Sequence, residues 1–122
     1  MNPHHETGRN GETLAREFLE QKGYTILYQN WRKGSYEIDL IALHKDLLII
    51  AEVKTRSYSG VLEPQLAVNK AKQKSLFQAA QLFMTTTGRE NELRFDVIAV
   101  VANKQESRIE HIEDAFRAFE RR

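Results

Sequence analysis

Asp39, Glu52 and Lys54 are the residues whose types and spacing could do chemistry. Each lies in an apolar segment typical of a β-strand, Asp39 in Glu37–His44 and the other two in Leu47–Thr55. The polar step between these segments predicts a hairpin. A turn symmetric about that step places Asp39 directly opposite Glu52, with Cβ atoms about 4.5 to 5.5 Å apart. Because side chains alternate along a strand, Lys54 lies on the face of Glu52.

Both faces of this hairpin are apolar, which predicts that both are covered and that the two acids are buried. Buried carboxylates without partners take up a proton or a metal ion. Oxygen ligands with open water positions suit magnesium or manganese. Such a cation beside a lysine suits phosphodiester hydrolysis, because it polarises the phosphoryl group and activates a water. The alternative, that Asp39 and Glu52 form structural ion pairs with Lys54 and nearby arginines, stays open.

The pattern around these residues is typical of an α/β domain in which a mixed sheet is flanked by helices. Helical spacing predicts helices over Gly11–Lys22 and Pro64–Met84, with Glu12 at the edge of the apolar stripe of the first. Strand-like composition predicts five strands, over Tyr24–Trp31, Glu37–His44, Leu47–Thr55, Arg94–Val101 and Arg108–Ile112. A last apolar segment predicts a helical turn over Ala115–Phe119. The long helix is a crossover, so the strands that it joins are predicted to be parallel.

Composition narrows the class of protein. The 122 residues, 41% of them hydrophobic, fit a single domain over residues 1–122. With Cys 0 there is no disulfide, thiolate metal site or cysteine nucleophile. No segment approaches the roughly 20 apolar residues of a membrane span, and the start lacks a signal-peptide core, so we expect a cytoplasmic protein.

Positive charge must be concentrated locally if the chain binds nucleic acid, because the formal net charge is only +1. Lys70, Lys72 and Lys74 lie near the start of the long helix, and Arg56 follows Lys54 along its strand. We expect these residues to hold phosphates, which positions a duplex without reading its bases. The alternative is an ordinary solvated helix face.

Asp39, twelve further residues and Glu52-Val53-Lys54 resemble the PD-(D/E)xK motif of restriction-endonuclease-like nucleases. The surrounding sequence resembles the bacterial YraN family over nearly the whole chain. The matching stretches are Gly11-Glu12 with Ala15, Gly23-Tyr24, Asn30 with Arg32, Glu37-Ile38-Asp39-Leu40-Ile41-Ala42, Glu52-Val53-Lys54-Thr55-Arg56, Lys72, and Arg94-Phe95-Asp96-Val97-Ile98.

This resemblance implies a restriction-endonuclease-like fold. The layout is also similar to archaeal Holliday junction resolvases, which implies Glu12, Asp39 and Glu52 as metal-site acids and Lys54 as the catalytic lysine. We therefore expect a Mg²⁺- or Mn²⁺-dependent endonuclease that acts on DNA, branched DNA in particular. Related nucleases often act as dimers, so a homodimer is a further expectation. The alternative is a non-catalytic nucleic-acid-binding or assembly module that retains the fold.

Overall fold

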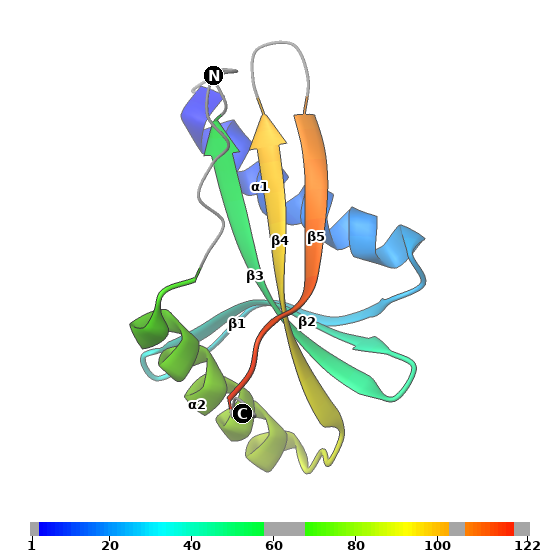
Figure 1. Ribbon diagram of the computed structural model, residues 1–122, viewed down its shortest axis with the longest axis vertical. Coiled ribbons are helices and arrows are strands. Elements are labelled where there is room, and N and C mark those ends of the chain that lie inside the picture. The colour runs from blue at the N-terminus through cyan, green and yellow to red at the C-terminus, as the bar shows by residue number, and fades with distance from the viewer. Residues whose placement is uncertain (1–2, 58–67, 103–106, 119–122) are drawn as a thin grey trace.

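The computed structural model describes residues 3–57, 68–102 and 107–118 of the chain. Figure 1 shows the helices and strands that they form. In chain order these elements are α1 (Pro3–Gln21), β1 (Thr25–Lys33), β2 (Tyr36–His44), β3 (Leu47–Ser57), α2 (Lys70–Thr87), β4 (Glu92–Ala102) and β5 (Ser107–Phe116).

The five strands form one sheet in the order β1-β2-β3-β4-β5. The pairing is parallel between β3 and β4 and antiparallel between the other neighbours. This confirms the mixed sheet and the role of α2 as the crossover between its two parallel strands. The chain has an α/β fold that is consistent with the restriction-endonuclease-like class.

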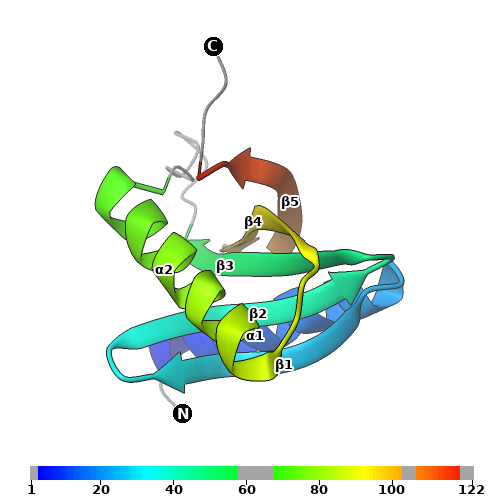
Figure 2. The same cartoon turned by 90° about the horizontal axis from the view of Figure 1, so that it is seen from below.

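The sheet is covered on both faces, as the apolar hairpin predicts. Ala15 and Leu19 of α1 pack on one face with alternate residues of β3 such as Ile49, while Leu76 and Phe83 of α2 belong to the apolar cluster on the other face. Figures 1 and 2 show the two helices on opposite sides of a strongly twisted sheet, in which β1 and β2 cross the direction of β4 and β5. The core therefore consists of two apolar layers.

The ends of the helices differ from the prediction. Helix α1 begins at Pro3, where the missing amide hydrogen costs nothing, and so extends well before Gly11. Helix α2 begins at Lys70, because the Asn69 side chain accepts a hydrogen bond from the amide of Lys72 and ends the helix there. Pro64, the predicted start, lies outside the described residues.

The predicted helical turn over Ala115–Phe119 is wrong where the structure describes it. Strand β5 continues through Phe116, which pairs with Phe95 in the sheet and stacks on its ring at 5.5 Å between centroids. A two-residue irregularity at Asp114, whose φ is 53°, lets the strand reach that position. Pairing with β4 outweighs the weak helical pattern of so short a segment.

No helix among the described residues is long and apolar enough to cross a membrane.

Candidate functional site

Asp39 lies where the hairpin of β2 and β3 stops pairing regularly. The register is symmetric about the turn, as predicted, from His44 opposite Leu47 to Leu40 opposite Ala51. Beyond that point the Asp39 carboxylate, through Oδ2, accepts the amide hydrogen of Val53 at 2.9 Å. The Asp39 side chain thus forms a hydrogen bond with a backbone amide of β3.

The other neighbour of β2 is also irregular at this level. In β1, Asn30 lies between Gln29 and Trp31, which pair with Leu40 and Ile38 on either side of Asp39. Its φ of 56° is a left-handed conformation that only asparagine, aspartate and glycine adopt readily. Asp39 therefore lies in an irregular part of the sheet, where its side chain need not follow the regular alternation of side chains between the two faces.

The carboxyl groups of Asp39 and Glu52 are in direct contact. The pKa of Asp39 is raised to about 7, and burial is the largest cause. The charge of Glu52, a side-chain hydrogen bond to Glu52 and the charge of Glu12 also contribute to this rise, whereas the hydrogen bond from Val53 acts against it. Two carboxyl groups that share a hydrogen bond hold a proton between them. The structure thus brings Asp39 and Glu52 together, while Glu12 of α1 acts on Asp39 through its charge.

Lys54 lies two residues beyond Glu52 on the same strand. Burial lowers the pKa of its ammonium, and the charge of Arg56 lowers it further, while Glu52 opposes the shift. An amine of this kind loses its proton more readily than a solvated lysine. Lys54 can therefore hold or release a proton beside the two acids.

Helix α2 brings a second amine that the hairpin geometry did not predict at the acids. The Nζ atom of Lys72 lies 4.0 Å from Oε2 of Glu52, whose side chain is only 15% exposed. The other predicted phosphate-binding residues, Arg56, Lys70 and Lys74, are exposed. Of these, the charge of Arg56 acts directly on Lys54.

The donor atoms at this site fit a hard divalent cation. Two carboxyl groups supply oxygen only, and one or two carboxylates with waters and substrate phosphates are the usual binding mode of Mg²⁺. Within the described ranges, no three His, Cys, Asp or Glu side chains are gathered into a ready metal-binding group. The fit therefore rests on the Asp39–Glu52 pair.

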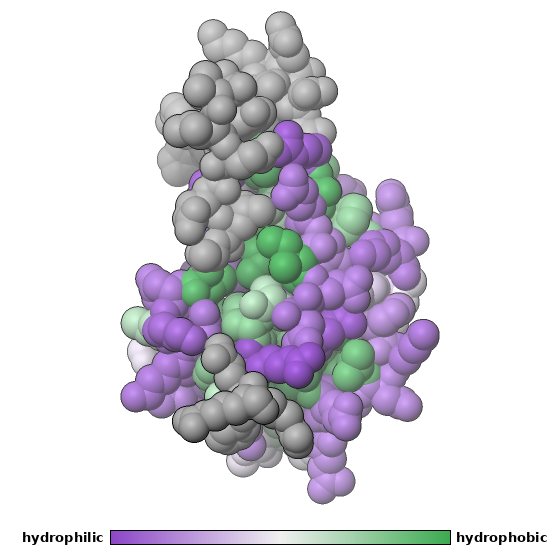
Figure 3. Space-filling model, in the orientation of Figure 1, coloured by the Kyte–Doolittle hydropathy of each residue, from purple (hydrophilic) through white to green (hydrophobic). Residues whose placement is uncertain are grey.

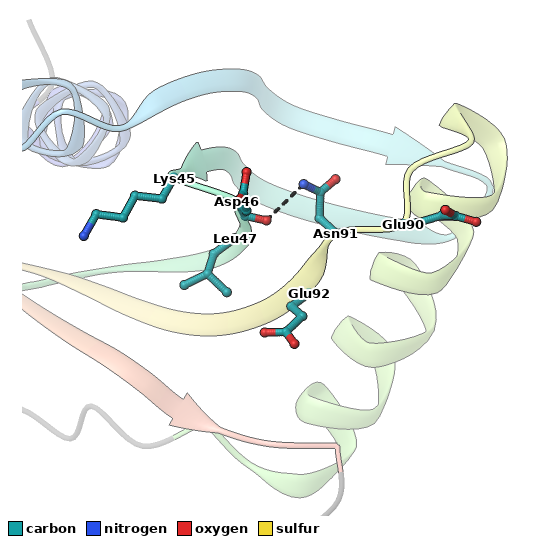
Figure 4. Close-up of a pocket in the computed structure, with 6 residues that line it drawn as sticks. All are labelled: Lys45, Asp46, Leu47, Glu90, Asn91 and Glu92. Atoms are coloured by element: carbon teal, nitrogen blue, oxygen red, sulfur yellow. Dashed lines mark hydrogen bonds between the residues drawn. The ribbon is translucent and has the colours of Figure 1, made fainter.

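Two surface hollows lie at the other end of the sheet. One is lined by the start of β3 and β4 and the residues before them, and Figure 4 shows Asn91 donating a hydrogen bond from Nδ2 to the carbonyl oxygen of Asp46 at 3.0 Å in this hollow. The second continues along Arg94 and Phe116. Leu47, which lines both, precedes Glu52 by five strand residues, about 17 Å along β3. Neither hollow includes Asp39 or Glu52, so the candidate site is defined by these two acids and their neighbours and not by a hollow.

Figure 3 shows the face of the molecule that carries α2. Hydrophilic residues lie on both sides of a small hydrophobic area at its centre. Glu52 belongs to this face, because Ile50, two residues before it, packs in the apolar cluster of α2.

A second buried carboxylate lies on the opposite face of the sheet, at Asp96 of β4. Its side chain is 0% exposed and accepts four hydrogen bonds. The guanidinium of Arg94 donates two of them at 2.9 Å, His111 Nε2 one at 2.7 Å and the amide of Asp114 one at 3.0 Å. Burial raises the pKa of Asp96, but these hydrogen bonds outweigh it and the net shift is downward.

The partners of Asp96 are themselves held by further contacts. Arg94 donates to the hydroxyl of Tyr24 at 2.7 Å and pairs with Glu113. Lys22 Nζ lies 2.8 Å from His111 Nδ1. Because an ammonium only donates, Nδ1 accepts and the ring proton is on Nε2, facing Asp96. We call this group, Arg94, Asp96, His111, Tyr24 and Lys22, the Asp96 network.

Comparison with known proteins places the chain among close relatives. A sequence profile of the uncharacterised protein family UPF0102 matches residues 11–100. A UPF0102 protein of Flavobacterium psychrophilum is 44% identical over 119 residues, 98% of this chain and 100% of that protein. Similar proteins of Bacteroides thetaiotaomicron and Chlorobium chlorochromatii are 40% and 46% identical, over 95% of this chain and 96% and 97% of theirs.

Proposed function

This chain belongs to the uncharacterised protein family UPF0102, and we propose that it is a metal-dependent endonuclease that hydrolyses phosphodiester bonds in DNA, branched DNA in particular. The observation that carries the proposal is the contact between Asp39 and Glu52. Burial and the neighbouring acids raise the pKa of Asp39 to about 7. Buried acids held together in this way need a cation or a proton, and perturbed acids of this kind concentrate at functional sites.

Asp39 and Glu52 would bind Mg²⁺ or Mn²⁺ through their oxygen atoms, and Glu12 is close enough in electrostatic terms to add to the attraction. The cation, when bound, supplies a Lewis acid that polarises the phosphoryl group and acidifies a water. The role of these acids would be to hold the positive charge of the cation at one point of the sheet. The hydrogen bond from Val53 orients the Asp39 carboxylate toward β3 for this purpose.

Lys54 would stabilise the charge that develops on the phosphate and accept or orient the proton of the attacking water. Burial and the charge of Arg56 lower its pKa, so Lys54 releases its proton more easily than a solvated lysine does. Arg56, Lys70, Lys72 and Lys74 would contact backbone phosphates around the site. Such contacts position a duplex by its shape, which suits selection of a branched structure over a sequence.

The deciding experiment is a cleavage assay on a four-way junction, a flap and a linear duplex, with Mg²⁺, with Mn²⁺ and with a chelator. We expect metal-dependent cutting that Glu52→Gln lowers by at least about 10³-fold, because a neutral amide lacks the negative charge that attracts the cation. Glu92→Gln is the matched control, since Glu92 is an exposed acid at the far end of the sheet. Circular dichroism should show both variants folded.

Full activity of Glu52→Gln would contradict the proposal. So would cutting that continues in the chelator. Binding of DNA that is the same with and without Mg²⁺, with no strand cut on any substrate, would instead identify a non-catalytic binding module that retains the fold.

A further inference from the structure

Lys72 is a charged group at the site to which the proposed reaction assigns no part beyond phosphate contact. Its Nζ atom lies 4.0 Å from Oε2 of Glu52. The lysine side chain is 41% exposed and the glutamate 15%. The ammonium therefore belongs to the more exposed member of this pair, where it can meet an incoming ion or phosphate.

The backbone that carries Lys72 is firmly placed. Its amide donates to Oδ1 of Asn69 at 2.8 Å, which fixes the first turn of α2. The neighbouring Gln73 donates from Nε2 to the carbonyl oxygen of Val68 at 2.8 Å, which holds the segment that enters the helix. One turn further on, Leu76 is buried in the core. A long side chain on a fixed backbone can move its ammonium over several ångströms without moving the helix.

The negative charges around Glu52 favour a cation beside it, and Lys72 provides one. Burial, together with the charges of Glu52 and Glu12, raises the pKa of Asp39 to about 7, so negative charge is concentrated around these acids. Lys54 follows Glu52 by two residues on β3 and is the other ammonium near these acids. Lys72 has its ammonium in water and faces the outer oxygen of Glu52. Its ammonium therefore balances part of the negative charge at Glu52.

An ion pair of this length, half in water, is weak and easily exchanged. A divalent cation at Glu52 would repel the ammonium while attracting the carboxylate more strongly than the ammonium does. The phosphate that arrives with the cation carries the opposite charge to Lys72. The same amine can therefore serve Glu52 in the free protein and the phosphate in the complex.

We propose that Lys72 is the resident counter-ion of Glu52, that a divalent cation displaces it, and that the released ammonium then binds a phosphate of the nucleic acid. This inference rests on the proposed function, because it requires a cation at Glu52. It adds an order to the events: cation binding frees the amine that grips the substrate. Metal and DNA would thereby bind cooperatively through one side chain.

The test measures two affinities of the full chain. Mn²⁺ affinity is measured without DNA by calorimetry, and junction DNA affinity is measured in Ca²⁺ to slow cutting. Lys72→Met should bind Mn²⁺ about three- to tenfold more tightly, because the competing charge is gone, and DNA weaker by a similar factor. The slope of log DNA affinity against log salt concentration should decrease in Lys72→Met by the amount of about one phosphate contact.

Two further variants distinguish this role from a structural one. Lys72→Arg keeps the charge and should resemble the wild type in both measurements. Lys74→Met removes an exposed lysine of the same helix and should leave Mn²⁺ affinity unchanged. A packing role for Lys72 predicts that both affinities fall together, whereas displacement predicts opposite signs.

Wild-type binding of Mn²⁺ that Lys72→Met leaves unchanged or weakens would overturn the inference alone. Absence of Mn²⁺ binding by the wild type, or binding that Glu52→Gln leaves intact, would overturn the proposed function and with it this inference. Lys72→Arg that behaves like Lys72→Met would also contradict the counter-ion role, because arginine carries the same charge.

Discussion

Asp39, partly buried, and Asp96, fully buried, are two aspartates of one sheet whose carboxyl groups have opposite pKa shifts. Asp96 accepts hydrogen bonds from Arg94, His111 and the amide of Asp114, and its pKa is lowered. Asp39 accepts one amide hydrogen and otherwise has acids as neighbours, and its pKa is raised to about 7. Desolvation raises the pKa of both carboxyl groups, so it is the hydrogen-bond partners and neighbouring charges that separate the two aspartates.

The difference lies in where the compensating charge comes from. At Asp96 the chain provides it: Arg94 is fixed by two contacts to the carboxylate and by the Tyr24 hydroxyl. At Asp39 the chain provides a proton between two acids and a loosely held amine at 4.0 Å from Glu52. Asp96 is therefore complete as it stands, whereas the Asp39–Glu52 pair can gain from a cation that comes from outside.

The largest expected effect tests this contrast directly. Asp96→Asn should cost about 3 to 5 kcal/mol of unfolding free energy at pH 7.5, because Arg94, 15% exposed, loses the buried member of its two countercharges and keeps only the exposed Glu113. Asp39→Asn should not destabilise the protein at this pH, since it removes a like charge beside Glu52. Urea denaturation of both variants measures the difference. A loss of several kcal/mol in Asp39→Asn would show that the two acids are alike after all.

The two aspartates should also give opposite dependences of stability on pH. Asp39 has a higher pKa folded than unfolded, so its contribution is full below about pH 4 and is lost as the pH rises through about 7. The shift from 3.8 to about 7 limits this loss to about 4 kcal/mol. Asp96 has a lowered pKa, so its contribution is present above about pH 4 and is lost in acid.

Urea denaturation between pH 3 and pH 8 checks this dependence. Asp39→Asn should flatten the decline from about pH 4 to pH 7 in metal-free buffer and leave the limb below pH 4 unchanged. A wild-type curve that keeps rising from pH 4 to pH 7, and that Asp39→Asn does not alter, would contradict the raised pKa.

Much of the Asp39 site could be predicted from the sequence because it is local. The polar step between two apolar segments determines the hairpin register, and that register is confirmed from His44–Leu47 to Leu40–Ala51. The regular pairing ends one pair before Asp39 and Glu52, so counting predicts that the two acids are neighbours but not the irregular bonding of Asp39 to Val53. The contact of Lys72 with Glu52 does not, because it depends on where a crossover helix packs on the sheet.

The Asp96 network shows the same limit more strongly. Arg94 and Asp96 lie two residues apart on one face of β4, and both belong to the Arg94-Phe95-Asp96-Val97-Ile98 stretch that resembles the YraN family. Their pairing with each other is therefore visible in the sequence. His111 and Tyr24 come from β5 and from the residue before β1, so no local spacing indicates that they meet Asp96. The helical turn predicted after β5 failed for the same reason, since pairing with β4 holds Phe116 in the sheet.

The smallest effect concerns Glu12, which acts on Asp39 and not on Asp96. Gly11, just before it, packs so closely on β3 that a Cβ atom would overlap the Thr55 hydroxyl. Gly11→Ala should therefore cost about 1 to 3 kcal/mol and move Glu12 away from the acids. The pKa of Asp39, followed by NMR, should fall as the charge of Glu12 recedes, while that of Asp96 stays constant.

Gly11→Ala combined with Thr55→Ala is the control, because removing the hydroxyl relieves the closest overlap. Recovery of both stability and the Asp39 pKa in this double variant would tie the two effects to one contact between α1 and β3. Movement of the Asp96 pKa in Gly11→Ala would show instead that the helix disturbs the whole sheet. The two carboxylates would then not be independent, and the contrast between them could not be assigned to their immediate partners.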